Sequence, residues 1–210
     1  MTKKELAVKA TLLLEREYPD AICSLNYEDP FQLLIATRLS AQCTDARVNM
    51  VTPALFEAFP DAKSMASAPL DRVEELIKTC GLYKTKAKDL IGIGKGIIEN
   101  FDGQVPDTIE ELITLPGVGR KTANLIVGDV YKKPAVVTDT HFIRIVNRLG
   151  LTKTREPYKV EKELKELLPP DKSNDFCHRT VLHGRAVCTA RRAFCEKCIM
   201  SNICKKVGVK

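Results

Sequence analysis

Four cysteines between residues 188 and 204 constrain this end of the chain to fold around one point. They are Cys188, Cys195, Cys198 and Cys204, with the spacing C-x6-C-x2-C-x5-C. Four thiolates that converge in this way hold a metal ion or an iron–sulfur cluster. Structural zinc sites often use two separated C-x2-C pairs, whereas here one such pair is closely flanked by single cysteines. The pattern therefore favours a [4Fe–4S] cluster, with zinc as the main alternative and a disulfide as the weaker one.

The positive charge of the chain is concentrated in this cysteine segment. From residue 184 onward there are seven basic residues and one acidic residue, Glu196, a net charge of +6 that equals the net charge of the whole chain. The basic residues are Arg185, Arg191, Arg192, Lys197, Lys205, Lys206 and Lys210. A local excess of this kind indicates a polyanionic partner such as nucleic acid.

Composition and the N-terminal sequence restrict the class of protein further. No apolar stretch approaches the roughly 18 residues that a membrane span needs. The start, Met-Thr-Lys-Lys-Glu, lacks the apolar segment of a secretory signal. We therefore expect a cytoplasmic protein that does not bind a membrane. Tryptophan is absent and aromatic residues make up 6% of the chain, which argues against an aromatic stacking platform for single strands.

Apolar residues recur at helical spacing almost throughout, so the fold class is predicted to be all-α. Asp45 is predicted to cap the start of one helix. Only residues 135–137 have strand character, and they are too few to build a sheet. Glycines at 92, 94 and 96 superficially resemble a dinucleotide loop, but their spacing is wrong and no strand precedes them. Helices are expected at 4–18, 31–39, 48–56, 71–77, 86–100, 107–113, 121–131, 139–149, 159–168 and 175–187.

The segment Leu-Pro-Gly-Val-Gly-Arg-Lys-Thr-Ala at 115–123 predicts a tight hairpin between two helices. Gly117 and Gly119 permit the reversal, and the unpaired N–H groups at the start of the second helix would form a phosphate seat. Such a hairpin grips the DNA backbone without reading sequence. An ordinary helix–turn–helix connection is the alternative, and the adjacent Arg120 and Lys121 favour DNA.

Several motifs in fixed order resemble the endonuclease III family of helix-hairpin-helix DNA glycosylase/lyases with an iron–sulfur cluster loop. They are LSAQCTD at 39–45, GLY at 81–83, LPGVGRKTAN at 115–124, TDTH at 138–141 and the four spaced cysteines. The resemblance covers about residues 5 to 204. It implies a base excision repair enzyme that acts on double-stranded DNA carrying an oxidised pyrimidine or an abasic site.

The resemblance also assigns two catalytic residues. Lys121 matches the family nucleophile, whose amine attacks C1′, expels the base and leaves an imine that permits β-elimination on the 3′ side. Asp139 matches the partner carboxylate. From the residues alone, Lys121 could be a solvated helix residue, and Asp139 could simply cap a helix that begins at Thr140. The alternative functions are a monofunctional adenine or mismatch glycosylase, which typically lacks the lysine, and a non-catalytic DNA-binding iron–sulfur protein.

By the same resemblance, Gln42 and Leu82 are candidates to fill the gap left by an extruded nucleotide. Their alternatives are a helix-end cap for Gln42 and a buried core leucine for Leu82. His178 and His183 are expected to serve packing or phosphate contacts. The complete set of expected DNA contacts is Gln42, Leu82, Gly117, Gly119, Arg120, Arg191 and Arg192.

The family architecture implies two helical domains. A six-helix domain, 22–132, would carry the hairpin at 107–131, and residues 1–21 with 133–210 would form the cluster domain. Lys121 and Asp139 would then face each other across the groove between them. We expect a monomer associated with the nucleoid.

Overall fold

The computed structural model describes residues 1–209, and every regular element in that range is a helix. Cys188 and Ala193 form an isolated bridge, and no β-strand occurs among the described residues. The all-α prediction is therefore confirmed. None of these helices is long and apolar enough to cross a bilayer. The chain divides into two units, residues 24–131 and residues 1–23 with 132–210.

The unit 24–131 contains seven helices where six were predicted. The additional short helix, α4, begins with a capping box in which Asp61 and Ser64 exchange hydrogen bonds, and its five residues are too few to show a helical period. The prediction that Asp45 caps α3 is wrong, because the hydroxyl of Thr44 accepts the cap hydrogen bond from the Arg47 N–H. The helices are α2 (Pro30–Ser40), α3 (Asp45–Ala58), α4 (Ala62–Ala66), α5 (Leu70–Leu76), α6 (Tyr83–Asn100), α7 (Ile109–Leu112) and α8 (Arg120–Asp129).

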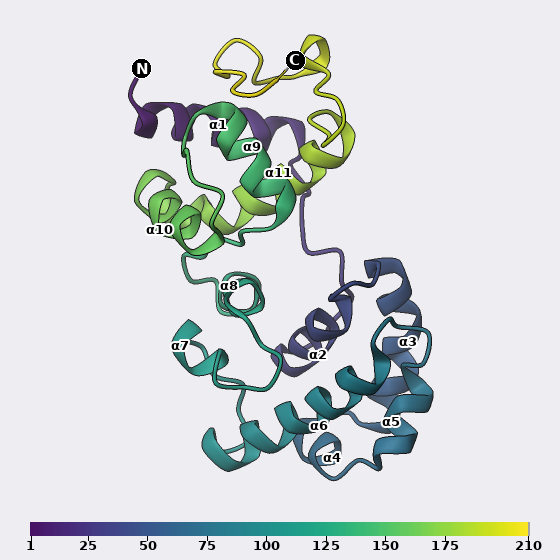
Figure 1. Cartoon of the computed structure of the whole chain (residues 1–210). Helices are drawn as coiled ribbons and strands as arrows, with labels where there is room; N and C mark the ends of the chain where they lie inside the picture. Colours follow the sequence, from purple (N-terminus) through teal and green to yellow (C-terminus); the bar gives the residue numbers. More distant parts are fainter. Residues whose placement is uncertain (210) are drawn as a thin grey trace. The chain divides into compact units, whose positions relative to one another are not determined.

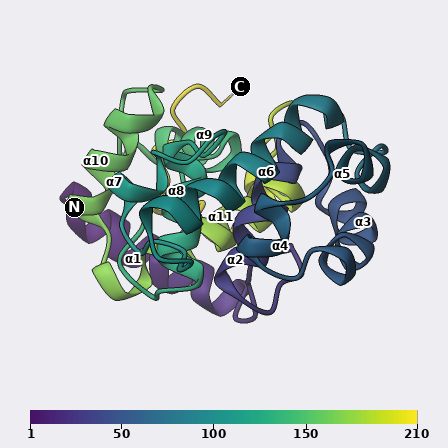
Figure 2. The ribbon, with the colours of Figure 1, turned by 90° about the horizontal axis from the view of Figure 1, so that it is seen from below.

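Close packing against α6 explains its three regularly spaced glycines. A Cβ added at Gly94 would lie 2.8 Å from backbone atoms of α4, which packs on α6 in both views (Figures 1 and 2). A Cβ at Gly92 would lie 3.0 Å from Pro116, and one at Gly96 would lie 2.7 Å from Leu115. These glycines therefore let α4 and the 115–119 turn approach the axis of α6.

The other unit joins the N-terminal helix to the last third of the chain. Helix α1 packs on α10 and α11, and α9 packs on α11 (Figure 1). The side chains of Phe142 and Phe176 meet edge to face with ring centroids 6.0 Å apart, and Lys172 Nζ contacts Glu15 Oε2 at 2.7 Å. The elements are α1 (Lys3–Glu17), α9 (Thr140–Leu149), α10 (Pro157–Leu167), the 3-10 turn η1 (Pro170–Lys172), α11 (Ser173–Ala186) and the 3-10 turn η2 (Cys195–Lys197).

Candidate functional site

The predicted hairpin is formed by α7, a tight turn and α8. Leu115 and Val118 are buried, and the Val118 N–H donates to the Leu115 carbonyl oxygen at 3.2 Å. Gly119 is the N-cap of α8, and no side chain caps this helix. The start of α8 thus carries the N–H groups and positive dipole end that suit a phosphate.

The 115–119 turn packs against an ion pair between α2 and α6. Gly117 has φ +69, and a Cβ added there would overlap Arg38 and lie 2.8 Å from Asp89 Oδ2. Arg38, on α2, donates from Nε to the same Asp89 oxygen at 2.9 Å, and Asp89 lies on α6. Only glycine satisfies both the backbone conformation and this contact. Sequence reasoning missed Arg38 and Asp89.

Lys121 is exposed at the second position of α8, immediately after the turn. Its exposure agrees with a solvated helix residue and equally leaves the amine accessible to a ligand. Arg120 precedes it and is half-buried, with its carbonyl oxygen accepting from Asn124 Nδ2 at 3.0 Å. The catalytic role of Lys121 stays a prediction.

Gln42 and Leu82 lie in two turns that contact each other. A Cβ at Gly81 would lie 3.2 Å from the Gln42 carbonyl oxygen. Both Gln42 and Leu82 have positive φ, 54° and 59°, which is uncommon for residues other than glycine. The alternative of a buried leucine is wrong, because Leu82 is 61% exposed and is the N-cap of α6.

Asp139 is the N-cap of α9, as one of its two interpretations predicted. Its Oδ1 accepts a hydrogen bond from the Phe142 N–H at 2.6 Å. The carboxylate is half-buried, so the capping role does not exclude a second one. The pairing of Asp139 with Lys121 stays a prediction.

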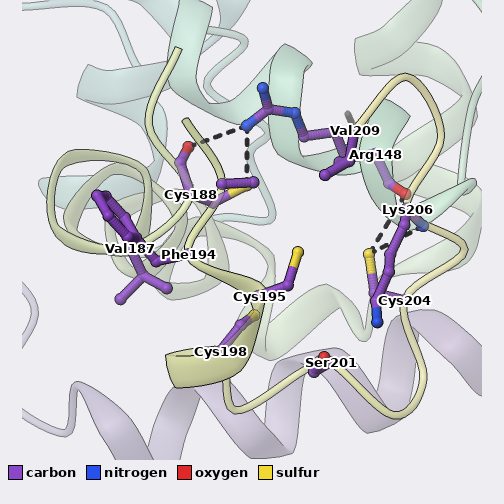
Figure 3. A pocket seen from close by; sticks show the side chains of 11 residues that line it. Arg148, Val187, Cys188, Phe194, Cys195, Cys198, Ser201, Cys204, Lys206 and Val209 are labelled. Atoms are coloured by element: carbon purple, nitrogen blue, oxygen red, sulfur yellow. Dashed lines mark hydrogen bonds between the residues drawn. The ribbon is translucent and has the colours of Figure 1, made fainter. Parts of the chain in front are cut away.

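The four predicted cysteine ligands line one pocket (Figure 3). All four are half-buried, and Arg148 and Phe194 belong to the same lining. Turns bring the cysteines together, with the Cys198 N–H donating to the Cys195 carbonyl oxygen at 3.3 Å and the Cys204 N–H donating to the Met200 carbonyl oxygen at 2.9 Å. Across residues 1–209, no group of three or more His, Cys, Asp or Glu side chains has the arrangement that would hold a single metal ion.

Polar groups around the pocket point at its sulfur atoms. Arg148 donates to Cys188 Sγ at 3.1 Å, and the Lys206 N–H donates to Cys204 Sγ at 3.3 Å (Figure 3). Burial, and then the neighbouring cysteines, raise the pKa of Cys198 and Cys204, although backbone hydrogen bonds oppose the shift. A bound cation would reverse this effect, because thiols deprotonate when they coordinate a metal. The donor set therefore fits an iron–sulfur cluster.

Of the two histidines before this segment, the structure shows the role of His183, while the role of His178 stays a prediction. His183 is buried, with Nδ1 3.2 Å from the Tyr18 hydroxyl and Nε2 3.4 Å from Cys198 Sγ, so of its two predicted roles it packs and does not reach phosphate. Arg191 and Arg192 are exposed in the loop between Cys188 and Cys195, and the Arg192 guanidinium lies 4.8 Å from the Phe194 ring centroid. Both arginines are thus accessible, and their DNA contacts stay predictions.

Comparison with known proteins identifies the family of this chain. A family model described as HhH-GPD superfamily base excision DNA repair protein matches residues 35–170. An endonuclease III of Synechocystis sp. is 48% identical over 204 residues, which cover 97% of this chain and 93% of that protein. The chain belongs to the endonuclease III family.

Other members of the endonuclease III family agree in length and fold. The endonuclease III of Bacillus subtilis is 40% identical over 190 residues, which cover 90% of this chain and 87% of that protein. A solved endonuclease III, trapped as a covalent intermediate with DNA, has a TM-score of 0.90 and 37% identity, covering 98% of this chain and 97% of that one. The resemblance first noted in the motifs is thus confirmed over nearly the whole chain.

Proposed function

We propose that this chain is a bifunctional DNA glycosylase and abasic-site lyase that excises oxidised pyrimidines from double-stranded DNA. The observation that carries this proposal is an accessible lysine, Lys121, at the start of an uncapped helix that follows the hairpin turn. Membership in the endonuclease III family supports it, since a relative with a TM-score of 0.90 was trapped in covalent attachment to DNA. The partner is duplex DNA with a damaged base or an abasic site, bound by a monomer in the nucleoid.

Lys121 acts as the nucleophile in this reaction. Its uncharged Nζ attacks C1′ of the damaged nucleotide, and the bond from C1′ to the base breaks. A proton then passes from the nitrogen to O4′ as the C1′–O4′ bond opens, which leaves a protonated imine. The imine makes the 2′ proton acidic, and its removal expels the 3′ phosphate by β-elimination.

Asp139 supplies a carboxylate to the same reaction, either accepting the amine proton or stabilising positive charge on the sugar. Asp139→Asn separates this role from capping, because the amide oxygen of asparagine can still accept the hydrogen bond from Phe142. We expect the variant to keep wild-type stability and to lose excision. Full activity of a folded Asp139→Asn protein would contradict a chemical role for the carboxylate.

A [4Fe–4S] cluster held by Cys188, Cys195, Cys198 and Cys204 belongs to the proposal. When bound, it would supply four iron–thiolate bonds that hold the 188–204 loop in one shape. That loop presents Arg191 and Arg192 to phosphates.

Gln42 and Leu82 are proposed to enter the duplex when the nucleotide leaves it. An exposed leucine in the left-handed region is unfavourable both for hydration and for the backbone, which suggests that the side chain is kept for a ligand. Leu82→Ala should slow excision from a fully paired duplex more than from a bulged one. Met50→Ala, which removes an exposed side chain on α3, is the matched control. Equal losses on both substrates would contradict insertion.

The experiment that tests the function is borohydride trapping on a duplex containing thymine glycol. Wild type and Lys95→Ala, which removes an exposed lysine on α6, should both give a reduced covalent adduct. Lys121→Ala should give none while remaining folded. Base release without an adduct would mean that water is the nucleophile, as in a monofunctional glycosylase, and would overturn the imine mechanism.

A further inference from the structure

Two thiols lie beside the side chains proposed to enter DNA. Cys43 follows Gln42 in the turn after α2, and Cys80 precedes Gly81 and Leu82 in the turn before α6. The Cys43 N–H closes its turn on the Ser40 carbonyl oxygen at 3.1 Å, and the Cys80 N–H closes the other on the Ile77 carbonyl oxygen at 2.8 Å. These turns touch at Gly81, so residues far apart in the sequence become neighbours.

The Cys43 and Cys80 side chains, here called the thiol pair, belong to the two turns that touch at Gly81, and they are near enough for Cys43 to affect the ionisation of Cys80. Cys80 is 1% exposed, whereas Cys43 is half-buried. Burial and the neighbouring Cys43 raise the pKa of Cys80 to about 11. A small oxidant from solvent therefore meets Cys43 first, with Cys80 held behind it.

A buried cation lies next to the thiol pair. Lys86 is fully buried, and its Nζ donates to the Leu39 carbonyl oxygen at 2.8 Å. Burial lowers the pKa of Lys86, while the two cysteines oppose that shift. In the same way Lys86 partly offsets the rise in the pKa of Cys80. Burial remains the larger effect, so Cys80 stays a protonated thiol at neutral pH.

We propose that Cys43 and Cys80 form an oxidation site, at which hydrogen peroxide converts the two thiols into a disulfide. Peroxide takes two electrons from the Cys43 sulfur, which becomes a sulfenic acid as one water leaves. The Cys80 sulfur then attacks Cys43, loses its proton and displaces the sulfenic oxygen as a second water. One peroxide and two thiols become one disulfide and two waters, and a dithiol reductant reverses the reaction.

The disulfide would fix the turn of Gln42 to the turn of Leu82. Because both side chains must adjust to enter a base stack, oxidation should slow turnover of paired DNA, a consequence that rests on the proposed function. A displacement of about 1 Å in a reacting complex can cost roughly 100-fold. We therefore expect a loss of about 10- to 100-fold, restored by dithiothreitol.

The test uses the whole chain with its iron–sulfur cluster bound. After treatment with hydrogen peroxide, free thiols are alkylated and the peptides are mapped by mass spectrometry. A peptide linking Cys43 to Cys80 should appear in wild type and in the control Cys177→Ser, which removes a buried thiol in the other unit, and should vanish with dithiothreitol. Cys80→Ser should instead leave Cys43 as sulfenic or sulfinic acid, and Cys43→Ser should give no linked peptide.

Two outcomes would overturn the proposal. One is Cys43 oxidised to sulfinic acid in wild type while Cys80 is still alkylated. The other is a linked peptide in which either thiol is joined to a different cysteine. Mapping needs no enzymatic activity, so a linked peptide from a protein inactive even when reduced supports the oxidation site and refutes the proposed function. A fully oxidised protein with undiminished turnover refutes the effect on base extrusion.

Discussion

Replacing Gly117 by alanine should destabilise the protein far more than the same change two residues later at Gly119. Gly117 has φ +69, and the new methyl group would overlap Arg38 and crowd Asp89. Gly119 has φ −95, and an added Cβ there meets nothing within 4 Å. The two substitutions add the same methyl group to the same turn, so their difference isolates the packing beneath it.

The expected magnitude follows from two costs. Holding alanine in the left-handed region costs about 1–2 kcal/mol, and overlap with a packed neighbour adds about 1–3 kcal/mol. Alanine also lowers the conformational entropy of the unfolded chain, which stabilises the folded state by about 0.4–1 kcal/mol. Gly117→Ala should therefore lower the free energy of unfolding by about 1–5 kcal/mol, centred near ~3 kcal/mol. Gly119→Ala places a poorer N-cap at the start of α8 and should lose about 1 kcal/mol or less.

Urea denaturation followed by circular dichroism measures this difference, with binding to an undamaged duplex as the second readout. Gly119→Ala should keep a midpoint near wild type yet bind DNA more weakly, because its methyl group stands at the phosphate seat. Gly117→Ala should shift the midpoint strongly with an unchanged slope. Equal midpoints for the two variants would refute the contact between the turn and the Arg38–Asp89 ion pair.

Three further predictions concern charged side chains. Arg191→Ala should flatten the dependence of log Kd on log salt by about 0.9 for duplex DNA, measured by fluorescence anisotropy, if Arg191 contacts one phosphate. Arg148→Gln removes hydrogen bonds to the carbonyl oxygens of Cys188 and Thr189 and to Cys188 Sγ, and should cost about 1.5–3 kcal/mol in urea denaturation. Burial lowers the pKa of Lys86 below 10.5, so the folded state loses this proton before the unfolded state does. The stability of wild type relative to Lys86→Met should then rise with pH from that lowered pKa up to 10.5, and a flat difference would contradict it.

Features set by neighbouring residues could be predicted from the sequence. The hairpin depends on Pro116, Gly117 and Gly119, and the cap of α9 depends on Asp139 and a backbone group three residues later. The spacing of the four cysteines likewise indicated one shared site. In each case the chemistry of a short segment limits the backbone to few conformations.

Features set by distant partners could not be predicted. Arg38 and Asp89 are 51 positions apart, and nothing near either residue indicates the other. The spacing of the glycines of α6 excluded a nucleotide loop, but their close contacts with Pro116 and α4 could not be predicted. Leu82 illustrates a different limit, since leucine is usually buried and only the turn against Gln42 leaves it exposed.

The membership of α1 in the unit with residues 132–210 sets an order of events during synthesis. Leu6, Ala7 and Leu14 of α1 are buried in the finished protein, where the helix packs on α10 and α11. A ribosome adding about 5–20 residues per second delivers α10 roughly 7–30 seconds after α1, and α11 later still. Residues 24–131 can meanwhile complete their own core. Helix α1 thus leaves the ribosome well before the helices that cover its apolar face, and that face stays unpaired until they follow.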